Sequence, residues 1–409
     1  MPFHQTLLDN GLEIIGEVNP QAQSTAVGFF VRTGARDEAL EVSGVSHFLE
    51  HMAFKGNEEF SADDVNRIFD EVGANYNAST SEEVTIYHAA ILPEYLDQTM
   101  KLLTAMMQPS LREEDFEVEK KVILEEIGMY DDMPSFSVYE QAMLRHFAGH
   151  PLGQLVLGTR ESIAALTAQQ MRDYHAIRYG AANLVLVAAG NFQWDHLVDL
   201  SQSHCGNWTR GTPGRNQTEA CPVTSRSFLV RDEMHQEHVM QLGRAPAGQS
   251  DLRYIAEIVA SIVGEDGSGR LYWDLVESGD AESCDLGYND FDGSGAWMTY
   301  LCCQPEQTEA NLERMDQILA EFNRTGPTRD EFELAKTKIA SRIVLGNERP
   351  LGRFSALGGN WLSLHQYRTV EDDLKTLRSL TLNDARTLLD AYPLTLQTTA
   401  GLGPCDLSS

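Results

Sequence analysis

Long apolar runs, basic residues and paired cysteines are the features in which this sequence of 409 residues is poor. No stretch reaches the roughly 18 consecutive apolar residues that a transmembrane helix needs. The first residues, 1–6, lack the basic and apolar regions that are typical of a secretory signal peptide. We therefore expect no membrane partner and a cytoplasmic location.

Basic residues are scarce relative to acidic ones. The chain has 31 Lys and Arg against 61 Asp and Glu, so its formal net charge is −30. Nucleic acids and anionic membranes repel a surface of this sign, and we expect neither as a partner. The charge would suit a basic peptide, and it would equally serve solubility alone.

Cysteine patterns that hold metals or disulfide frameworks are also missing. The six cysteines show no Cys-x-x-Cys spacing. The adjacent Cys302 and Cys303 would point to opposite faces of a strand. We expect reduced thiols in the core or in loops.

The stretch Gly44–Gly56 separates into two faces when it is placed on a helix. Apolar residues follow the i, i+3, i+4, i+7 spacing of a buried stripe at Val45, Phe48, Leu49 and Met52. The other side carries His47, Glu50 and His51. Two imidazoles four residues apart can hold one metal ion, and Glu50 lies close enough to take a proton from a water on that metal. A motif this short also fits a solvated charged face, so a third ligand is needed.

Candidates for the third ligand lie in the segment Phe116–Ile127, within a helix predicted over 113–130. Glu119 and Glu126 are two helical turns apart and share a face, whereas Glu125 is rotated away from both. Zinc in a hydrolase usually takes three protein ligands, and a further carboxylate often orients one of them. The alternative is an acidic, solvated helix face.

Together these residues resemble the family of zinc peptidases that includes pitrilysin, insulin-degrading enzyme and mitochondrial processing peptidase. That family pairs His-x-x-Glu-His, the inverzincin motif, with a downstream Glu in a segment that ends as Glu126-Ile127 does here. The resemblance covers the first half of the chain strongly and the second half more weakly. Other stretches that match are Gly73–Thr80, His150–Gly153 and Tyr179–Gly190.

The resemblance implies a zinc metalloendopeptidase that hydrolyses peptides or small unfolded proteins. Its Zn²⁺ ligands would be His47, His51 and Glu126. Glu50 would be the general base for the zinc-bound water, and Glu119 a further catalytic residue behind a ligand. A peptide-binding protein with a structural metal is the alternative, but such a site has no need of a base like Glu50.

The resemblance also implies that the peptide lies as an added strand along 75–81. The nearest candidates for binding it are Tyr76, Asn77 and Ala78.

The second half departs from the family at two positions. The family usually contributes an Arg and a Tyr from this half to the zinc site, whereas Val276 and Ser283 stand there in this chain. Arg270 and Tyr288 are the substrate-binding substitutes that we expect, unless another subunit supplies the pair. We therefore expect a homodimer, or a heterodimer with a related subunit. The alternative function is a non-catalytic or weakly active subunit that needs a partner chain.

Length and an internal repeat predict two domains. The chain is too long for one hydrophobic core, and two domains of about 200 residues each are expected. The segment Asp115–Ile127 returns as Glu331–Ile343, 216 positions further on. We expect an α+β fold of two homologous α/β domains. Each would be an antiparallel-rich sheet packed with helices, and the resembled family pairs them like a clam.

The domains are predicted over 1–208 and 227–409, with a polar linker rich in Gly and Pro over 209–226. At the repeat offset Glu119 becomes Ala335 and Glu126 becomes Arg342. No His-x-x-Glu-His occurs near position 260. The second copy is therefore expected to be degenerate and without a zinc site.

Overall fold

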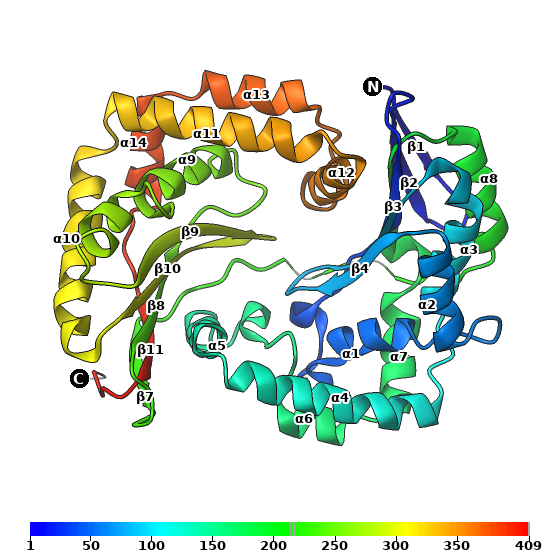
Figure 1. Ribbon diagram of the computed structural model, residues 1–409, viewed down its shortest axis with the longest axis horizontal. Coiled ribbons are helices and arrows are strands. Elements are labelled where there is room, and N and C mark those ends of the chain that lie inside the picture. The colour runs from blue at the N-terminus through cyan, green and yellow to red at the C-terminus, as the bar shows by residue number, and fades with distance from the viewer. Residues whose placement is uncertain (213, 216, 408–409) are drawn as a thin grey trace. The chain divides into compact units, whose positions relative to one another are not determined.

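The computed structural model describes residues 1–212, 214–215 and 217–407 and divides into two compact units (Figure 1). Unit 1 is formed by Met1–Gly128, Gln154–Asn216 and Val344–Arg368, and unit 2 by Met129–Gly153, Gln217–Ile343 and Thr369–Ser409. Positions 213 and 216 of the predicted linker lie outside the described residues. Among the helices that the structure describes, none has the length and apolar character needed to cross a membrane.

Unit 1 contains a six-stranded mixed sheet. Its strands are β1 (Phe3–Leu7), β2 (Glu13–Val18), β3 (Thr25–Val31), β4 (Asn75–Thr80), β5 (Thr85–Ile91) and β6 (Leu184–Gly190). Their order is β1-β2-β6-β3-β5-β4, in which β2 and β6 are parallel and the other neighbours antiparallel. Because every residue of β3 and β6 is buried, both faces of the central strands are covered.

Helices cover this sheet from two sides, with α3 and α8 on one side and α12 on the other (Figure 1). The helices that begin in unit 1 are α1 (Val45–Ala53), α2 (Ala62–Glu71), α3 (Leu96–Met106), α4 (Glu113–Asp131), α6 (Arg160–Ala165), α7 (Ala168–Arg178), α8 (Trp194–Cys205) and α12 (Pro350–Leu364). Gly358 of α12 lies against the ring of Phe30, where a Cβ would come within 2.1 Å of a ring atom. Only glycine permits this close packing of α12 on the sheet.

Unit 2 repeats the arrangement with five strands. They are β7 (Ser225–Val230), β8 (Glu237–Arg244), β9 (Ser283–Phe291), β10 (Ser294–Cys303) and β11 (Thr398–Gly403). The order is β7-β11-β8-β10-β9, with β7 and β11 parallel and the rest antiparallel, which is the unit 1 pattern without β1. Its helices are α5 (Pro134–His146), α9 (Arg253–Gly264), α10 (Thr308–Thr325), α11 (Arg329–Asn347), α13 (Val370–Ser379) and α14 (Leu382–Ala391).

Two lysines show how closely the units correspond. Lys120 of α4 donates to two carbonyl oxygens at the end of α6, at 2.7 and 3.3 Å. Lys336 of α11, its counterpart at the repeat offset, donates to two carbonyl oxygens at the end of α13, both at 3.0 Å. The two α/β copies predicted from the sequence are confirmed, although each sheet is mixed because of one parallel pair.

The units are not the contiguous halves that the sequence predicted. Helix α5 belongs to the first half of the chain but packs on β8 and β11 of unit 2, where Ala142 and Met143 join the core around Leu242. Helix α12 belongs to the second half but packs on β3 and β6 of unit 1, where Phe354 and Trp361 are buried. The predicted boundaries at 208 and 227 miss this exchange, because an apolar helix face does not indicate which sheet it covers.

Candidate metal centre

Helix α1 places three polar side chains on one side because its other side is in the core. Val45, Phe48, Leu49 and Met52 are buried, as the spacing predicted. The helix begins after Gly44, whose φ of 89° suits only glycine. Its first turn is fixed by Glu38, whose carboxylate accepts the backbone N–H groups of Gly44 at 2.6 Å and Ser46 at 2.7 Å. Burial raises the pKa of Glu38 to about 8, and these two hydrogen bonds act in the opposite direction.

Helix α4 lies against α1 through stacked aromatic rings. The ring centroids of Phe48 and Phe116 are 4.7 Å apart and the rings are nearly parallel. Ile123 and Ile127 are buried on the same helix. This packing turns Glu119 and Glu126 toward the polar side of α1.

The structure brings His47, His51 and Glu126 into one cluster, in which one possible ligand atom from each lies within 4.8 Å of the others. Nε2 of His47 is 3.8 Å from Oε1 of Glu126, and Nε2 of His51 is 3.5 Å from Oε2. Oε2 of Glu126 is buried and has no hydrogen-bond partner among the described residues. Two imidazoles and a carboxylate are the donor set of a catalytic zinc site, so these residues fit Zn²⁺.

The electrostatics of the cluster suit a cation. Burial, together with the charge on His51, lowers the pKa of His47 to about 4, so its imidazole is neutral and keeps a lone pair at neutral pH. Burial also opposes protonation of His51, but the hydrogen bond to Glu119 and the charge of Glu126 raise its pKa. Burial raises the pKa of Glu126. In the metal-free protein a proton therefore competes for the position that a metal ion would take.

Glu119 orients His51 and is itself held by a lysine. Its Oε1 accepts a hydrogen bond from Nδ1 of His51 at 2.9 Å, which leaves Nε2 of that ring free for a metal. Its Oε2 pairs with Nζ of Lys55 at 2.5 Å. The hydrogen bond from His51 and then the contacts with Lys55 lower the pKa of Glu119, so that it is ionised. Lys55 was not predicted as a site residue, although it stands one helical turn beyond His51.

Glu50 lies beside this cluster and is held from the sheet. Thr80 Oγ1, at the end of β4, donates to Oε2 of Glu50 at 2.6 Å. Burial raises the pKa of Glu50, and the hydrogen bond from Thr80 opposes this shift. Thr80 was not predicted as a site residue, and its hydroxyl is a second site group that the sequence reasoning missed.

The predicted peptide-binding residues stand on the edge strand of the same unit. In the described sheet β4 pairs with β5 alone, so its outer edge has no neighbouring strand. Tyr76 stacks on Phe69 with ring centroids 4.0 Å apart. Asn77 is exposed and its Oδ1 accepts the N–H of Ala78 at 2.9 Å, while the side chain of Ala78 is buried. Helix α1 contacts β4, so this edge lies next to the metal helix.

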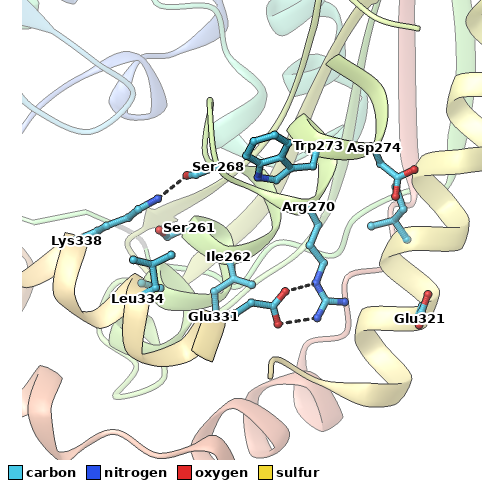
Figure 2. A pocket seen from close by; sticks show the side chains of 12 residues that line it. Ser261, Ile262, Ser268, Arg270, Trp273, Asp274, Glu321, Glu331, Leu334 and Lys338 are labelled. Atoms are coloured by element: carbon cyan, nitrogen blue, oxygen red, sulfur yellow. Dashed lines mark hydrogen bonds and ion pairs between the residues drawn. The ribbon is translucent and has the colours of Figure 1, made fainter. Parts of the chain in front are cut away.

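Arg270 and Tyr288 belong to unit 2, and both are engaged there. The guanidinium of Arg270 pairs with both carboxylate oxygens of Glu331, at 2.7 and 2.9 Å, in the wall of a hollow of about 410 Å³ (Figure 2). The hydroxyl of Tyr288 donates to the carbonyl oxygen of Pro246 at 2.8 Å. Each side chain would have to leave these partners to bind a peptide, so their assignment to the substrate stays a prediction.

The chain matches two family descriptions in succession. Residues 13–160 match "Insulinase (Peptidase family M16)", and residues 165–339 match "Peptidase M16 inactive domain". The metal cluster is drawn from the first of these two segments.

Relatives and solved structures agree with these matches. A zinc protease of Mycobacterium bovis is 32% identical over 386 residues, which cover 93% of this chain and 88% of the relative. A zinc protease of Bacillus subtilis is 29% identical over 376 residues, with 91% of each chain covered. A protease from Helicobacter pylori has the same fold at 20% identity, with a TM-score of 0.91 and coverage of 98% of this chain and 99% of that one. A Pseudomonas fluorescens structure described as a peptidase M16 inactive domain also has a TM-score of 0.91, at 16% identity, covering 99% of this chain and 98% of that one.

The two family matches follow one another along the chain, and the Mycobacterium bovis relative matches nearly all of it. The chain therefore belongs to the insulinase family of peptidases, M16.

Proposed function

We propose that this chain is a zinc metalloendopeptidase that hydrolyses peptides or small unfolded proteins. The observation that carries the proposal is the geometry of unit 1. Three features on contacting elements support it: the cluster of His47, His51 and Glu126, the carboxylate of Glu50 beside it, and the edge of β4 that has no neighbouring strand in the described sheet.

The mechanism assigns a role to each of these groups. His47, His51 and Glu126 would hold the zinc ion, which when bound activates water and polarises a carbonyl oxygen. Glu50 accepts a proton from the attacking water and returns it to the leaving amine. Its carboxylate lies on the same face of α1 as the two imidazoles, so proton transfer needs no rearrangement of the helix.

The edge of β4 would bind the peptide as an added antiparallel or parallel strand. Backbone N–H and C=O groups on an open edge recognise any extended peptide, so affinity would not depend on a strict sequence. Tyr76, Asn77 and Ala78 are the residues of β4 that we assign to this contact. The acidic chain, with a net charge of −30, would favour peptides that carry basic residues.

One observation favours a second candidate, a weakly active subunit that needs a partner chain. Val276 and Ser283 stand where the family usually has its Arg and Tyr, and the expected substitutes, Arg270 and Tyr288, already have partners. A homodimer or a heterodimer with a related subunit, in the cytoplasm, remains part of this proposal. Val276→Arg combined with Ser283→Tyr should then raise the activity of the isolated chain.

The test is cleavage of a mixed peptide library by the zinc-loaded protein, with and without chelator. Glu50→Gln should keep its zinc and lose about 10²–10⁴ in turnover, the usual contribution of a general base. Glu125→Gln, an exposed neighbour on α4, is the matched control and should behave as the parent. Turnover by Glu50→Gln at the parent rate, with full zinc, would refute the role of Glu50. If neither the parent nor the Val276→Arg, Ser283→Tyr variant cleaves any peptide, the peptidase proposal fails for the isolated chain.

A further inference from the structure

The hydroxyl of Thr80 has one proton to donate, and the structure shows where it goes. Oε2 of Glu50 lies 2.6 Å from Thr80 Oγ1, whereas the only other described acceptor, Thr85 Oγ1, lies at 3.4 Å. Thr85 donates its own proton to the carbonyl oxygen of Thr33 at 3.0 Å, so it cannot also donate to Thr80. The short contact is therefore a hydrogen bond from Thr80 to the carboxylate of Glu50.

This contact fixes a torsion that would otherwise be soft. The terminal torsion of a Glu side chain has a broad, roughly two-fold energy profile, so a carboxylate with one free rotor samples many orientations. The hydrogen bond holds Oε2 and leaves Oε1 as the oxygen that can accept a proton. Because Thr80 ends β4, it holds Glu50 from the sheet while α1 holds it from the helix.

We infer that Thr80 is a positioning residue, which orients Glu50 for proton transfer and ties the base to the strand that binds the peptide. The inference rests on the proposed function. Thr80 pairs with Thr85 across β4 and β5, so the backbone that would bind the substrate and the hydroxyl that holds Glu50 belong to one rigid ladder. The distance between the base and a peptide added to β4 is then set by one residue.

Two substitutions separate the hydroxyl from the shape of the side chain. Thr80→Val keeps the volume and β-branching but removes the hydrogen bond, and Thr80→Ser keeps the hydroxyl. We expect Thr80→Val to lower kcat about 10- to 100-fold, the scale of loss that a misplaced catalytic group causes, with KM and zinc content unchanged. Thr80→Ser should restore a rate near that of the parent.

A matched control is available in the same unit. The hydroxyl of Thr99 on α3 is buried and has no hydrogen-bond partner among the described residues. Thr99→Val is the same chemical change without loss of a contact to Glu50, and it should leave kcat unchanged. An equal loss of kcat in Thr99→Val and Thr80→Val would overturn the inference.

A double-mutant cycle tests whether Thr80 acts through Glu50. In the Glu50→Gln background, Thr80→Val should cause no further loss of kcat, because the group that it orients is already gone. In the metal-free protein, the shifts of the unfolding midpoint caused by Thr80→Val and Glu50→Ala should also fail to add, since each substitution removes one partner of the same hydrogen bond. Additive effects in either cycle, or a Thr80→Ser rate as low as that of Thr80→Val, would overturn the role of Thr80. Wild-type turnover by Glu50→Gln would instead overturn the proposed mechanism itself.

Discussion

Replacing Glu119 by Gln should weaken zinc binding although all three proposed ligands remain. The Glu119 carboxylate joins His51 Nδ1 at 2.9 Å to Lys55 Nζ at 2.5 Å. Its negative charge makes the His51 ring a better donor to a metal, and its position fixes which nitrogen faces Glu126. Gln is of similar size but has a single acceptor oxygen and no charge, so it can serve only one of the two partners.

The magnitude follows from these two contacts. Loss of a group that orients a metal ligand typically costs 10- to 100-fold in affinity, or about 1.4–2.8 kcal/mol. If the Gln oxygen keeps its hydrogen bond to His51, the orientation survives and the loss should be near tenfold. If the Gln amide turns its oxygen to Lys55, the ring loses its partner and the loss should approach 100-fold. Lys55→Met would remove only the outer contact, and we expect it to lie at the lower end.

The assay is competition for zinc between the metal-free protein and a chromophoric chelator at neutral pH. Glu125→Gln is the control, because Glu125 is an exposed neighbour on the same helix and its loss changes the net charge equally. The expected loss is at least about tenfold. A zinc affinity of Glu119→Gln within about twofold of the parent would therefore refute this reasoning. So would an equal loss in Glu125→Gln, which would show that the effect comes from net charge.

Three further predictions concern the zinc ligands, the docking of α12 and the pH dependence of stability. Zinc analysis should find one ion per parent chain and less in His47→Ala and Glu126→Gln; unchanged stoichiometry in both would contradict the ligand assignment. Arg353→Met should lower the unfolding free energy in urea by about 3–5 kcal/mol, because the buried carboxylate of Glu17 then keeps the hydrogen bond from Tyr367 but loses its cation at the contact that docks α12. Adding Glu17→Leu should recover much of this loss, and no recovery would argue against an uncompensated charge. Burial lowers the pKa of His146 to about 4, so the unfolded chain protonates first and stability should fall as pH drops from about 6.5 toward 4. His146→Gln should reduce this fall by up to about 3 kcal/mol in urea unfolding of the metal-free protein, and an identical pH profile would contradict it.

The metal helix could be predicted because its pattern is local. A helix repeats every 3.6 residues, so the positions of Val45 and Phe48 already place His47 and His51 on the opposite side. The same rule puts Glu119 and Glu126 on one face of α4. That these two helices meet was not local information, and it came from the resemblance to a known family.

Other parts of the site depend on contacts that no spacing encodes. The hydrogen bond from Thr80 to Glu50 joins residues from a strand and a helix, and a threonine in a strand is common for reasons of propensity alone. The placement of α5 and α12 on the sheets of the opposite repeat is of the same kind. The need for glycine at position 358, where α12 approaches Phe30, can be seen only after that contact is known.

The second unit folds in the same way without the residues of the metal cluster. There Arg342, which replaces Glu126 at the repeat offset, donates to Glu265 at 2.8 Å, and Lys338 lies 3.5 Å from the same carboxylate. Glu265 follows directly after α9, and both cations are on α11. Ion pairs between these side chains therefore join α9 to α11. A copy of the fold therefore closes with ion pairs where unit 1 keeps histidines and an acidic cluster. Burial raises the pKa of the Glu126 carboxyl, so a carboxylate in this position has no advantage as a structural device when ion pairs suffice. Its retention in unit 1, beside a base that Thr80 holds in place, is the pattern expected of residues kept for chemistry.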